Sequence, residues 1–298
     1  MNFEKLSIPL AFLTVLLVWT TTPLAIQWSS EGAPMTSAFY RMTIGMVFCV
    51  TVMLITQGRL PLSRESRRIY LVGGISIFLG TALFYSSAQL IPSGWVAVVF
   101  GLSPLITGVF SAIVEPEAKL TPSRVFGLLL GLSGLALVFS AGLRFEDASI
   151  LGLAYSAVAV TITSAASVYS RQLVKDQSIT GLQITAGSLI VALPLFMVTA
   201  YLVKPGLSAT FSSSAAYGVL YLGLMGSGVG FTLYYFLLKR VSASKISLVG
   251  LVTPITALTL GAVLNNEPVI ANVYYGAILV CTGLIFYEFK PRLGLRRM

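Results

Sequence analysis

The chain has 298 residues, of which 56% are hydrophobic and only 10% are charged, and its mean hydropathy is +0.89. This composition excludes a water-soluble globular protein and predicts an integral membrane protein. The net charge of +9 does not indicate nucleic-acid binding, because the basic residues fall in short connections between apolar segments.

Long apolar segments recur along the whole chain, each sufficient to cross the ~30 Å hydrocarbon core of a bilayer as a helix. Strand-like alternation of polar and apolar residues is absent. The first segment follows Lys5 as a signal peptide would, but its length and the lack of a small-residue cleavage site predict that it is retained. We expect an all-α protein with ten transmembrane helices, at roughly residues 6–27, 36–56, 69–89, 92–113, 124–141, 149–170, 181–203, 214–238, 245–264 and 272–289.

The basic residues fall mainly on one side of these ten spans. Of the 19 lysines and arginines, all except Arg41, Arg144 and Lys204 lie in the N-terminal segment, the C-terminal segment or connections on the same side. Cytoplasmic connections carry an excess of Lys and Arg, so we expect both termini to be cytoplasmic.

The two halves of the chain repeat one pattern. A proline near the middle of an apolar span is followed thirteen residues later by a glutamate, once within 103–117 and again within 253–267. Further matches at the same offset pair Gly73 with Gly223, Gly80 with Gly230 and Tyr85 with Tyr235. Because each half has an odd number of spans, the second half enters the membrane from the opposite side. We predict two inverted five-helix repeats, residues 1–142 and 143–298, an architecture common among secondary transporters.

Short motifs recur near the middles and ends of these spans. They are Trp19-Thr20-Thr21-Thr22-Pro23, Phe39-Tyr40-Arg41, Leu120-Thr121-Pro122 and the run from Leu237 to Ala243. Together these residues resemble the EamA-type branch of the drug/metabolite transporter superfamily. The resemblance implies a ten-span carrier, in most members an exporter of amino acids, related metabolites or drugs. It also implies that spans one, three, four, six, eight and nine line the substrate cavity.

The two central prolines are candidates for the cavity wall. Each removes a backbone donor and so frees the carbonyl four residues earlier, on Phe100 and Gly250, to bind ligand or water. The alternative is that the prolines only kink their helices. Ser103 and Thr253 precede them and add hydroxyls at the same depth, unless those hydroxyls bond their own helix backbone.

Aromatic and hydroxyl side chains occur at a similar depth. Aromatic rings with a polar tip suit a cavity for an amphipathic solute, and Trp19 and Tyr234 are the preferred pair. The alternative for each ring is packing against lipid or a neighbouring helix. The sixth span adds Thr161, Thr163, Ser164 and Ser167. The full predicted substrate-binding set is Trp19, Thr22, Phe84, Tyr85, Phe100, Ser103, Pro104, Thr163, Ser164, Tyr234, Tyr235, Thr253 and Pro254.

Charged residues are almost absent from the spans. All ten acidic residues fall at helix ends or in loops and there is no histidine, so we do not expect obligatory proton coupling. Arg41 is the only basic residue inside a span, where it either attracts anions or gates, or snorkels to the headgroups. Glu117 and Glu267 are predicted to gate opposite faces; the alternative is that they cap helices.

Motifs for a cofactor or for catalysis do not occur. We find no phosphate loop, metal-ligand cluster or nucleophile-base constellation, and we interpret Cys49 and Cys281 as buried apolar fillers. We expect no cofactor, no metal and no nucleic acid, with a small-molecule substrate and membrane lipid as partners of a monomer. The predicted function is alternating-access transport of an amino acid or related amphipathic solute, drug-like ones included, across the cytoplasmic membrane by an exporter, facilitator or exchanger. A passive channel-like facilitator and an intramembrane enzyme are the alternatives.

Overall fold

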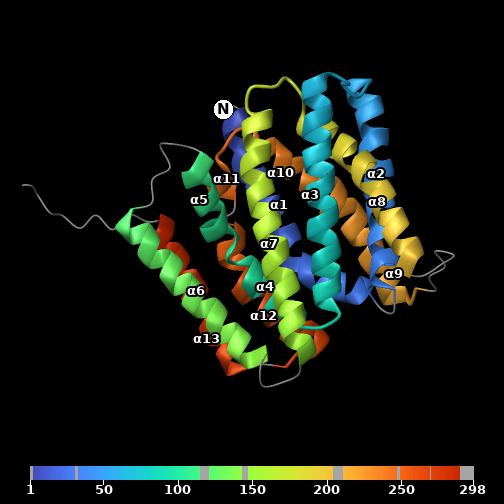
Figure 1. Ribbon diagram of the computed structural model, residues 1–298. Coiled ribbons are helices and arrows are strands. Elements are labelled where there is room, and N and C mark those ends of the chain that lie inside the picture. The colour runs from blue at the N-terminus through green and yellow to red at the C-terminus, as the bar shows by residue number, and fades with distance from the viewer. Residues whose placement is uncertain are drawn as a thin grey trace, which may run out of the picture.

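The computed structural model describes residues 3–30, 33–114, 121–142, 147–203, 211–246, 249–268 and 270–288, and every regular element in them is helical (Figure 1). Eight helical spans in this part of the chain are long and apolar enough to cross a membrane, and two shorter apolar helices, Thr253–Asn265 and Ala271–Tyr287, complete the predicted ten. The predicted all-α membrane fold is confirmed.

The first five spans comprise six helices, because the fourth span is broken in two. They are α1 (Phe3–Ser29), α2 (Pro34–Gln57), α3 (Arg64–Ala88), α4 (Ser93–Phe100), α5 (Ser103–Val114) and α6 (Pro122–Gly142).

The second five spans contain more breaks. They are α7 (Asp147–Val174), α8 (Gly181–Val203), the eighth span formed by α9 (Ser213–Tyr221), η1 (Leu222–Gly230) and α10 (Phe231–Leu238), the ninth formed by α11 (Ala243–Ile246) and α12 (Val249–Asn265), and α13 (Ala271–Glu288).

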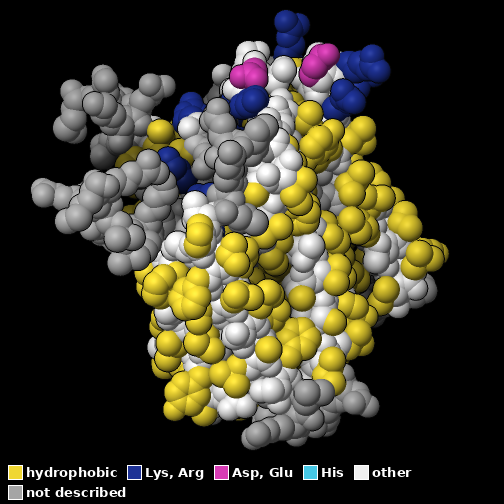
Figure 2. Space-filling model, turned by 60° about the vertical axis from the view of Figure 1, so that its left-hand side comes forward, with side chains coloured by type: hydrophobic (Ala, Val, Ile, Leu, Met, Phe, Trp, Pro, Cys, Tyr) yellow, Lys and Arg dark blue, Asp and Glu magenta, His cyan; other side chains and the backbone are white. Residues whose placement is uncertain are grey.

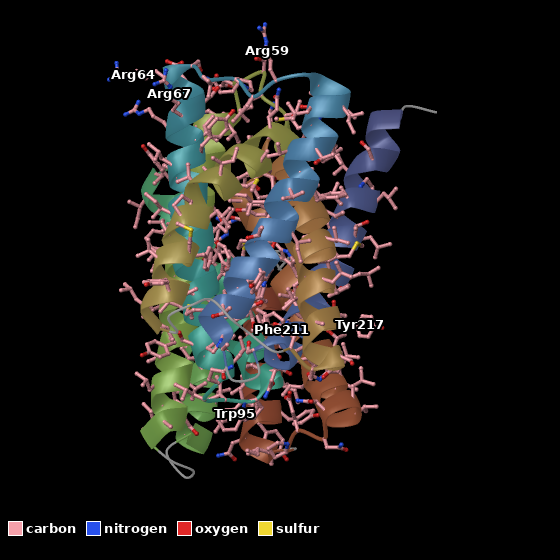
Figure 3. The ribbon with its side chains drawn as sticks, turned by 90° about the vertical axis from the view of Figure 1, so that its right-hand side faces the viewer. Arg59, Arg64, Arg67, Trp95, Phe211 and Tyr217 are labelled. Atoms are coloured by element: carbon pink, nitrogen blue, oxygen red, sulfur yellow. The ribbon has the colours of Figure 1, made fainter. Side chains whose placement is uncertain are left out.

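The spans alternate between two ends of the molecule, which we call the Arg59 end and the Trp95 end after residues labelled in Figure 3. At the Arg59 end, Gln183 at the start of α8 donates to the carbonyl of Arg59, and Arg171 at the end of α7 donates to that of Leu238. At the Trp95 end, Trp28 on α1 donates to Asn265 on α12. Since α1 starts at the Arg59 end and α7 at the Trp95 end, the two five-span halves are inverted, as predicted.

The fourth span departs from the continuous helix predicted over 92–113. Its α-helix stops at Phe100 and resumes at Ser103, because Pro104 cannot donate to the carbonyl of Phe100. The freed carbonyl faces the ninth span: a Cβ built on Gly250 would lie 3.5 Å from it. Breaks of this kind at membrane depth are tolerated where protein covers them.

The eighth span also departs from a regular helix. Residues Leu222–Gly230 form a π-helix with four glycines, flanked by α9 and α10. It packs closely on α2, since a Cβ on Gly45 would lie 2.7 Å from the Cβ of Ser227. Such π segments are uncommon and often mark functional sites.

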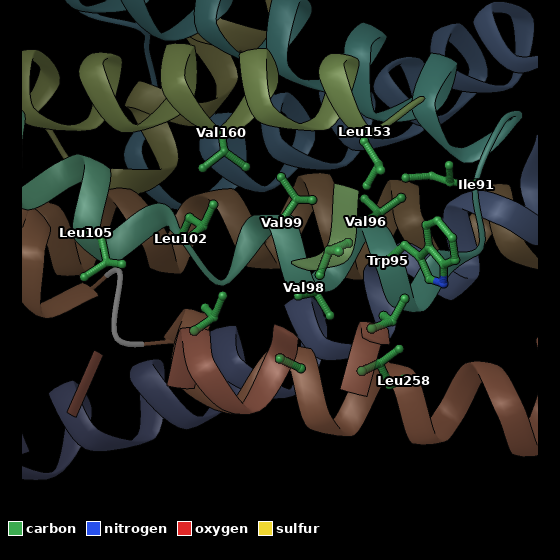
Figure 4. Close-up of a cluster of buried hydrophobic side chains, with 14 of the residues drawn as sticks. Ile91, Trp95, Val96, Val98, Val99, Leu102, Leu105, Leu153, Val160 and Leu258 are labelled. Carbon is green, nitrogen blue, oxygen red and sulfur yellow. The ribbon is translucent and has the colours of Figure 1, made fainter. Parts of the chain in front are cut away.

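Apolar side chains cover the outside of the molecule between the two ends. Figure 2 shows a face whose middle is hydrophobic, with Lys and Arg gathered at one end. Leu10, Leu17 and Ile55 are 61%, 61% and 79% exposed, as expected for side chains in contact with lipid. Inside, α4 packs between α7 and α12 through residues such as Val99, Val160 and Leu258 (Figure 4).

Candidate functional site

A cavity lies among helices of both halves. Its volume is about 180 Å³, and because about 10–15 Å³ of such space holds one water, it has room for a small solute. Its walls come from α1, α2, α3, α4, α5, α7, α10 and α11. These helices belong to spans one, two, three, four, six, eight and nine, so the structure adds the second span to the six that the resemblance implied.

Aromatic rings form one wall of the cavity. The ring centre of Trp19 lies 5.8 Å from that of Phe100, in an edge-to-face arrangement, and 5.5 Å from that of Tyr234. Phe84 extends the cluster through Phe100, at 6.2 Å, and Tyr235 through Tyr234, at 5.2 Å. The five rings come from four spans of the two halves, and all line the cavity. This wall can stack a planar apolar group.

Hydroxyl groups form a second wall along α7. Thr163, Ser167 and Ser170 line the cavity one helical turn apart, with Ser164 beside them. Tyr234 donates to the hydroxyl of Ser167 over 2.6 Å, which fixes the position of the preferred aromatic residue. Thr163 and Ser167 also bond carbonyls of their own helix, so their remaining hydrogen-bonding capacity is limited.

Arg41 brings a positive charge to the cavity wall. It is 4% exposed, so its guanidinium stays inside the protein and does not snorkel to the headgroups. Its Nε donates to the hydroxyl of Ser227 over 3.0 Å, and its Cζ lies 5.9 Å from the ring centre of Tyr85. The π-helix that carries Ser227 therefore positions the guanidinium.

Ten of the predicted binding and gating residues line this one cavity: Trp19, Thr22, Arg41, Phe84, Phe100, Ser103, Thr163, Ser164, Tyr234 and Tyr235. They come from six spans, and sequence alone places no two of those spans side by side. Ser103 contributes to the wall, but its hydroxyl is buried without a hydrogen-bond partner, and a Cβ on Gly250 would lie 3.1 Å from it.

Four predicted binding residues lie elsewhere. Tyr85 is fully buried beside α1, with its hydroxyl 3.2 Å from that of Ser29. Pro104 and Pro254 lie where the fourth and ninth spans pack on each other, since a Cβ on Gly101 would be 2.6 Å from the Pro254 ring. Thr253 donates to the carbonyl of Val249 in its own helix. The structure does not bring these four into the cavity wall.

The two predicted gating carboxylates are Glu117 and Glu267. Glu117 lies outside the described residues. Glu267 lies at the Trp95 end, away from the cavity, and accepts hydrogen bonds from the hydroxyl of Ser93 (2.6 Å) and the backbone of Gly94 (3.2 Å). It therefore caps α4, a helix of the other half.

Several lining residues were not predicted, among them Ser76, Thr81, Thr107 and Ser170; Ser167, named with the sixth span but not in the binding set, also lines the cavity. The hydroxyls of α7 recur at helical spacing, a signal that extends from Thr163 and Ser167 to Ser170. Nothing comparable marks Ser76, Thr81 and Thr107. Groups of three or more His, Cys, Asp or Glu that could hold a metal do not occur among the described residues.

Comparison with known proteins identifies the class to which this fold and cavity belong. The model of the EamA-like transporter family matches the chain twice, over residues 6–140 and 150–288. The chain therefore belongs to the EamA-like transporter family, within the drug/metabolite transporters. The two matches lie on either side of residues 141–149, and the boundary at 142 stays a prediction.

Full-length relatives carry transporter names. The "uncharacterized transporter YoaV" of Bacillus subtilis is 25% identical, over 94% of this chain and 96% of that protein. The "aromatic amino acid exporter YddG" of Ancylobacter novellus is 28% identical, over 81% of this chain and 83% of that protein. A solved crystal structure, 22% identical, has the same fold with a TM-score of 0.71 and covers 95% of this chain and 96% of its own.

Proposed function

We propose that this EamA-family transporter is an alternating-access carrier for a small amphipathic metabolite, an aromatic amino acid or a related solute, working as an exporter or facilitator. The observation that supports it best is a cavity lined by helices of two inverted halves, with an aromatic wall and a hydroxyl wall. Inverted halves with a binding site between them are typical of carriers that rock around a fixed site. The 28%-identical aromatic amino acid exporter supports the same solute class.

The test is transport by the purified protein in liposomes. Labelled tryptophan and phenylalanine, together with a pool of other amino acids and metabolites, are assayed for uptake into empty and preloaded vesicles. A carrier gives saturable flux that unlabelled solute inside accelerates. We expect Trp19→Ala to lower the flux at least about tenfold, because it removes the central ring of the aromatic wall.

The matched control is Leu17→Ala, on the same helix but 61% exposed, which should leave the flux unchanged. A passive channel-like facilitator is the second candidate, and flux that neither saturates nor responds to internal solute would favour it. Because the acidic residues lie outside the middles of the spans, collapsing a pH gradient should not abolish transport.

We further infer that the Arg59 end faces the cytoplasm, with both termini on that side of the cytoplasmic membrane. The support is the clustering of basic residues at that end, including Arg59, Arg64 and Arg67 (Figure 3). A relative of 25% identity, over 98% of this chain and 96% of that protein, is named an inner membrane transporter, YedA of Escherichia coli. A topology reporter fused after Met298 should report the cytoplasm; an external readout would reverse the assignment.

A further inference from the structure

Arg41 carries a positive charge inside the membrane-spanning part of the protein, in the cavity wall. Of its five N–H donors, Nε binds the neutral hydroxyl of Ser227, and the other donors have no hydrogen bond or ion pair with a described residue. One terminal nitrogen lies beside Gly226, where a Cβ would be 3.2 Å from it, so the missing side chain leaves room for the guanidinium.

The charge of Arg41 is not balanced by the cavity. The described residues that line it include no aspartate or glutamate, and the carboxylate of Glu267 is engaged at the start of α4. The contact with the Tyr85 ring, at 5.9 Å from the centre, is at the outer limit of a cation–π interaction. A buried charge in a membrane protein is costly unless an opposite charge pairs with it. Among the described residues, Arg41 is thus a cation in the cavity wall without an acidic partner.

We propose that Arg41 is the anchor for a carboxylate of the transported solute, whose planar apolar body stacks on Trp19, Phe100 and Tyr234. This inference rests on the proposed function, since it names the chemistry that the same cavity selects. A guanidinium offers paired N–H groups that match a carboxylate, and such charge-assisted hydrogen bonds are about twice as strong as neutral ones. The aromatic wall lines the same cavity and holds the rest of the molecule.

Two kinds of aromatic solute carry a carboxylate that Arg41 can bind. A monoanionic aromatic acid neutralises the cavity completely, whereas a zwitterionic aromatic amino acid also brings an ammonium group. In the described part of the chain, the lining offers aromatic faces and hydroxyls to an ammonium but no carboxylate. The monoanion should therefore bind at least as tightly as the zwitterion, and solutes without a carboxylate should bind much more weakly.

The test is calorimetric titration of the purified full-length protein at pH 7 with four indoles that differ in charge. They are indole-3-acetate (anion), tryptophan (zwitterion), the methyl ester of indole-3-acetate (neutral) and tryptamine (cation). The two carboxylates should bind at least about tenfold more tightly than the ester and tryptamine, which is the effect of one charge-assisted hydrogen bond. Arg41→Gln should remove that difference, and Arg59→Gln, outside the cavity, should preserve it.

Arg41→Lys provides a second variant that keeps the charge but loses the paired geometry, and we expect it to retain part of the preference. The proposal is overturned if the ester and tryptamine bind as tightly as the acids, if Arg41→Gln keeps the preference, or if none of the four indoles binds. A further outcome also rejects Arg41 as the carboxylate anchor. If Arg41→Gln binds the acids as tightly as before but lets tryptamine leak through the protein in liposomes, Arg41 is a barrier to cations.

Binding and flux separate this proposal from the proposed function. If the protein transports a solute into liposomes but shows no preference for carboxylates, the proposed carrier function is kept and the role of Arg41 as anchor is rejected. If the protein binds carboxylates preferentially through Arg41 but shows no saturable flux, the role of Arg41 as anchor is kept and the proposed carrier function is rejected.

Discussion

Glu267 shows how one side chain joins the two halves of the molecule. Asn266 takes a left-handed conformation, with φ of 50°, which ends α12 and turns the chain. The carboxylate of Glu267 then accepts hydrogen bonds from Ser93 and Gly94 at the first turn of α4, and another from Asn265. A negative charge is favourable there because the N-terminus of a helix carries a partial positive charge.

Replacing this carboxylate should weaken the link between the halves. Glu267→Gln keeps the shape of the side chain but removes the charge, so we expect the free energy of unfolding to fall by about 1–2 kcal/mol. Thermal unfolding in detergent measures the loss. Asp176→Asn is the control, because it removes an exposed carboxylate between α7 and α8 and should leave the melting temperature unchanged.

Sequence predicted the chemistry at single positions better than the direction in which side chains point. Phe84 and Tyr85 are neighbours that the sequence assigns to the cavity, yet only Phe84 lines it. Adjacent residues on a helix point about 100° apart, and a helix that packs on several others has no single polar face to reveal its orientation. The sequence allows two interpretations of Arg41, because its burial depends on the π-helix of another span.

Among the elements, α6 and α13 form a tightly packed pair at one side of the molecule (Figure 1). Their backbones approach at two points: a Cβ on Gly134 would lie 2.6 Å from the carbonyl oxygen of Gly276, and one on Gly127 would lie 2.4 Å from that of Gly283. Small residues allow such close contact between membrane helices. Neither helix contributes to the cavity wall.

A large side chain at this contact should therefore affect stability more than binding. We expect Gly134→Leu to force α6 away from α13 and to lower the free energy of unfolding by about 1–3 kcal/mol or more. Ser133→Leu adds the same side chain at an exposed neighbouring position and should cost little. Thermal unfolding compares the two variants, and equal melting temperatures would show that the helix pair tolerates separation.

The number and approximate positions of the spans could be predicted because apolar length is read directly from the sequence. The breaks could not. Pro104 made a kink foreseeable, but whether the helix bends or stops depends on what covers the free carbonyl, here Gly250 of another span. The π-helix over Leu222–Gly230 depends in the same way on the close approach of α2.

At the scale of the whole molecule, the Trp95 end is tied together by polar contacts among three helices. The side chain of Gln27 on α1 accepts a hydrogen bond from the backbone N–H of Ser93, and Glu267 accepts one from the hydroxyl of Ser93. Trp28, also on α1, donates a hydrogen bond to Asn265 over 3.0 Å. These contacts join α1, α4 and α12, which belong to both halves. Opening this end in a transport cycle requires that they separate.

The repeat predicts a counterpart at the other end. An offset of 150 residues relates Glu267 to Glu117 and Ser93 to Ala243, the first residue of α11. If each carboxylate holds its own end closed, removing one charge favours the state open at that end. Glu267→Gln should then shift the equilibrium toward opening at the Trp95 end, and Glu117→Gln toward opening at the Arg59 end.

This expectation can be measured with a cysteine at Ser103, which lies in the cavity wall between the two ends. The rate of its modification by an impermeant maleimide added at the Trp95 face should rise in Glu267→Gln and fall in Glu117→Gln. The native Cys49 and Cys281 are buried, and the protein without the new cysteine corrects for them. If both variants change the rate in the same direction, or neither changes it, the carboxylates act as helix caps alone and the gates lie elsewhere.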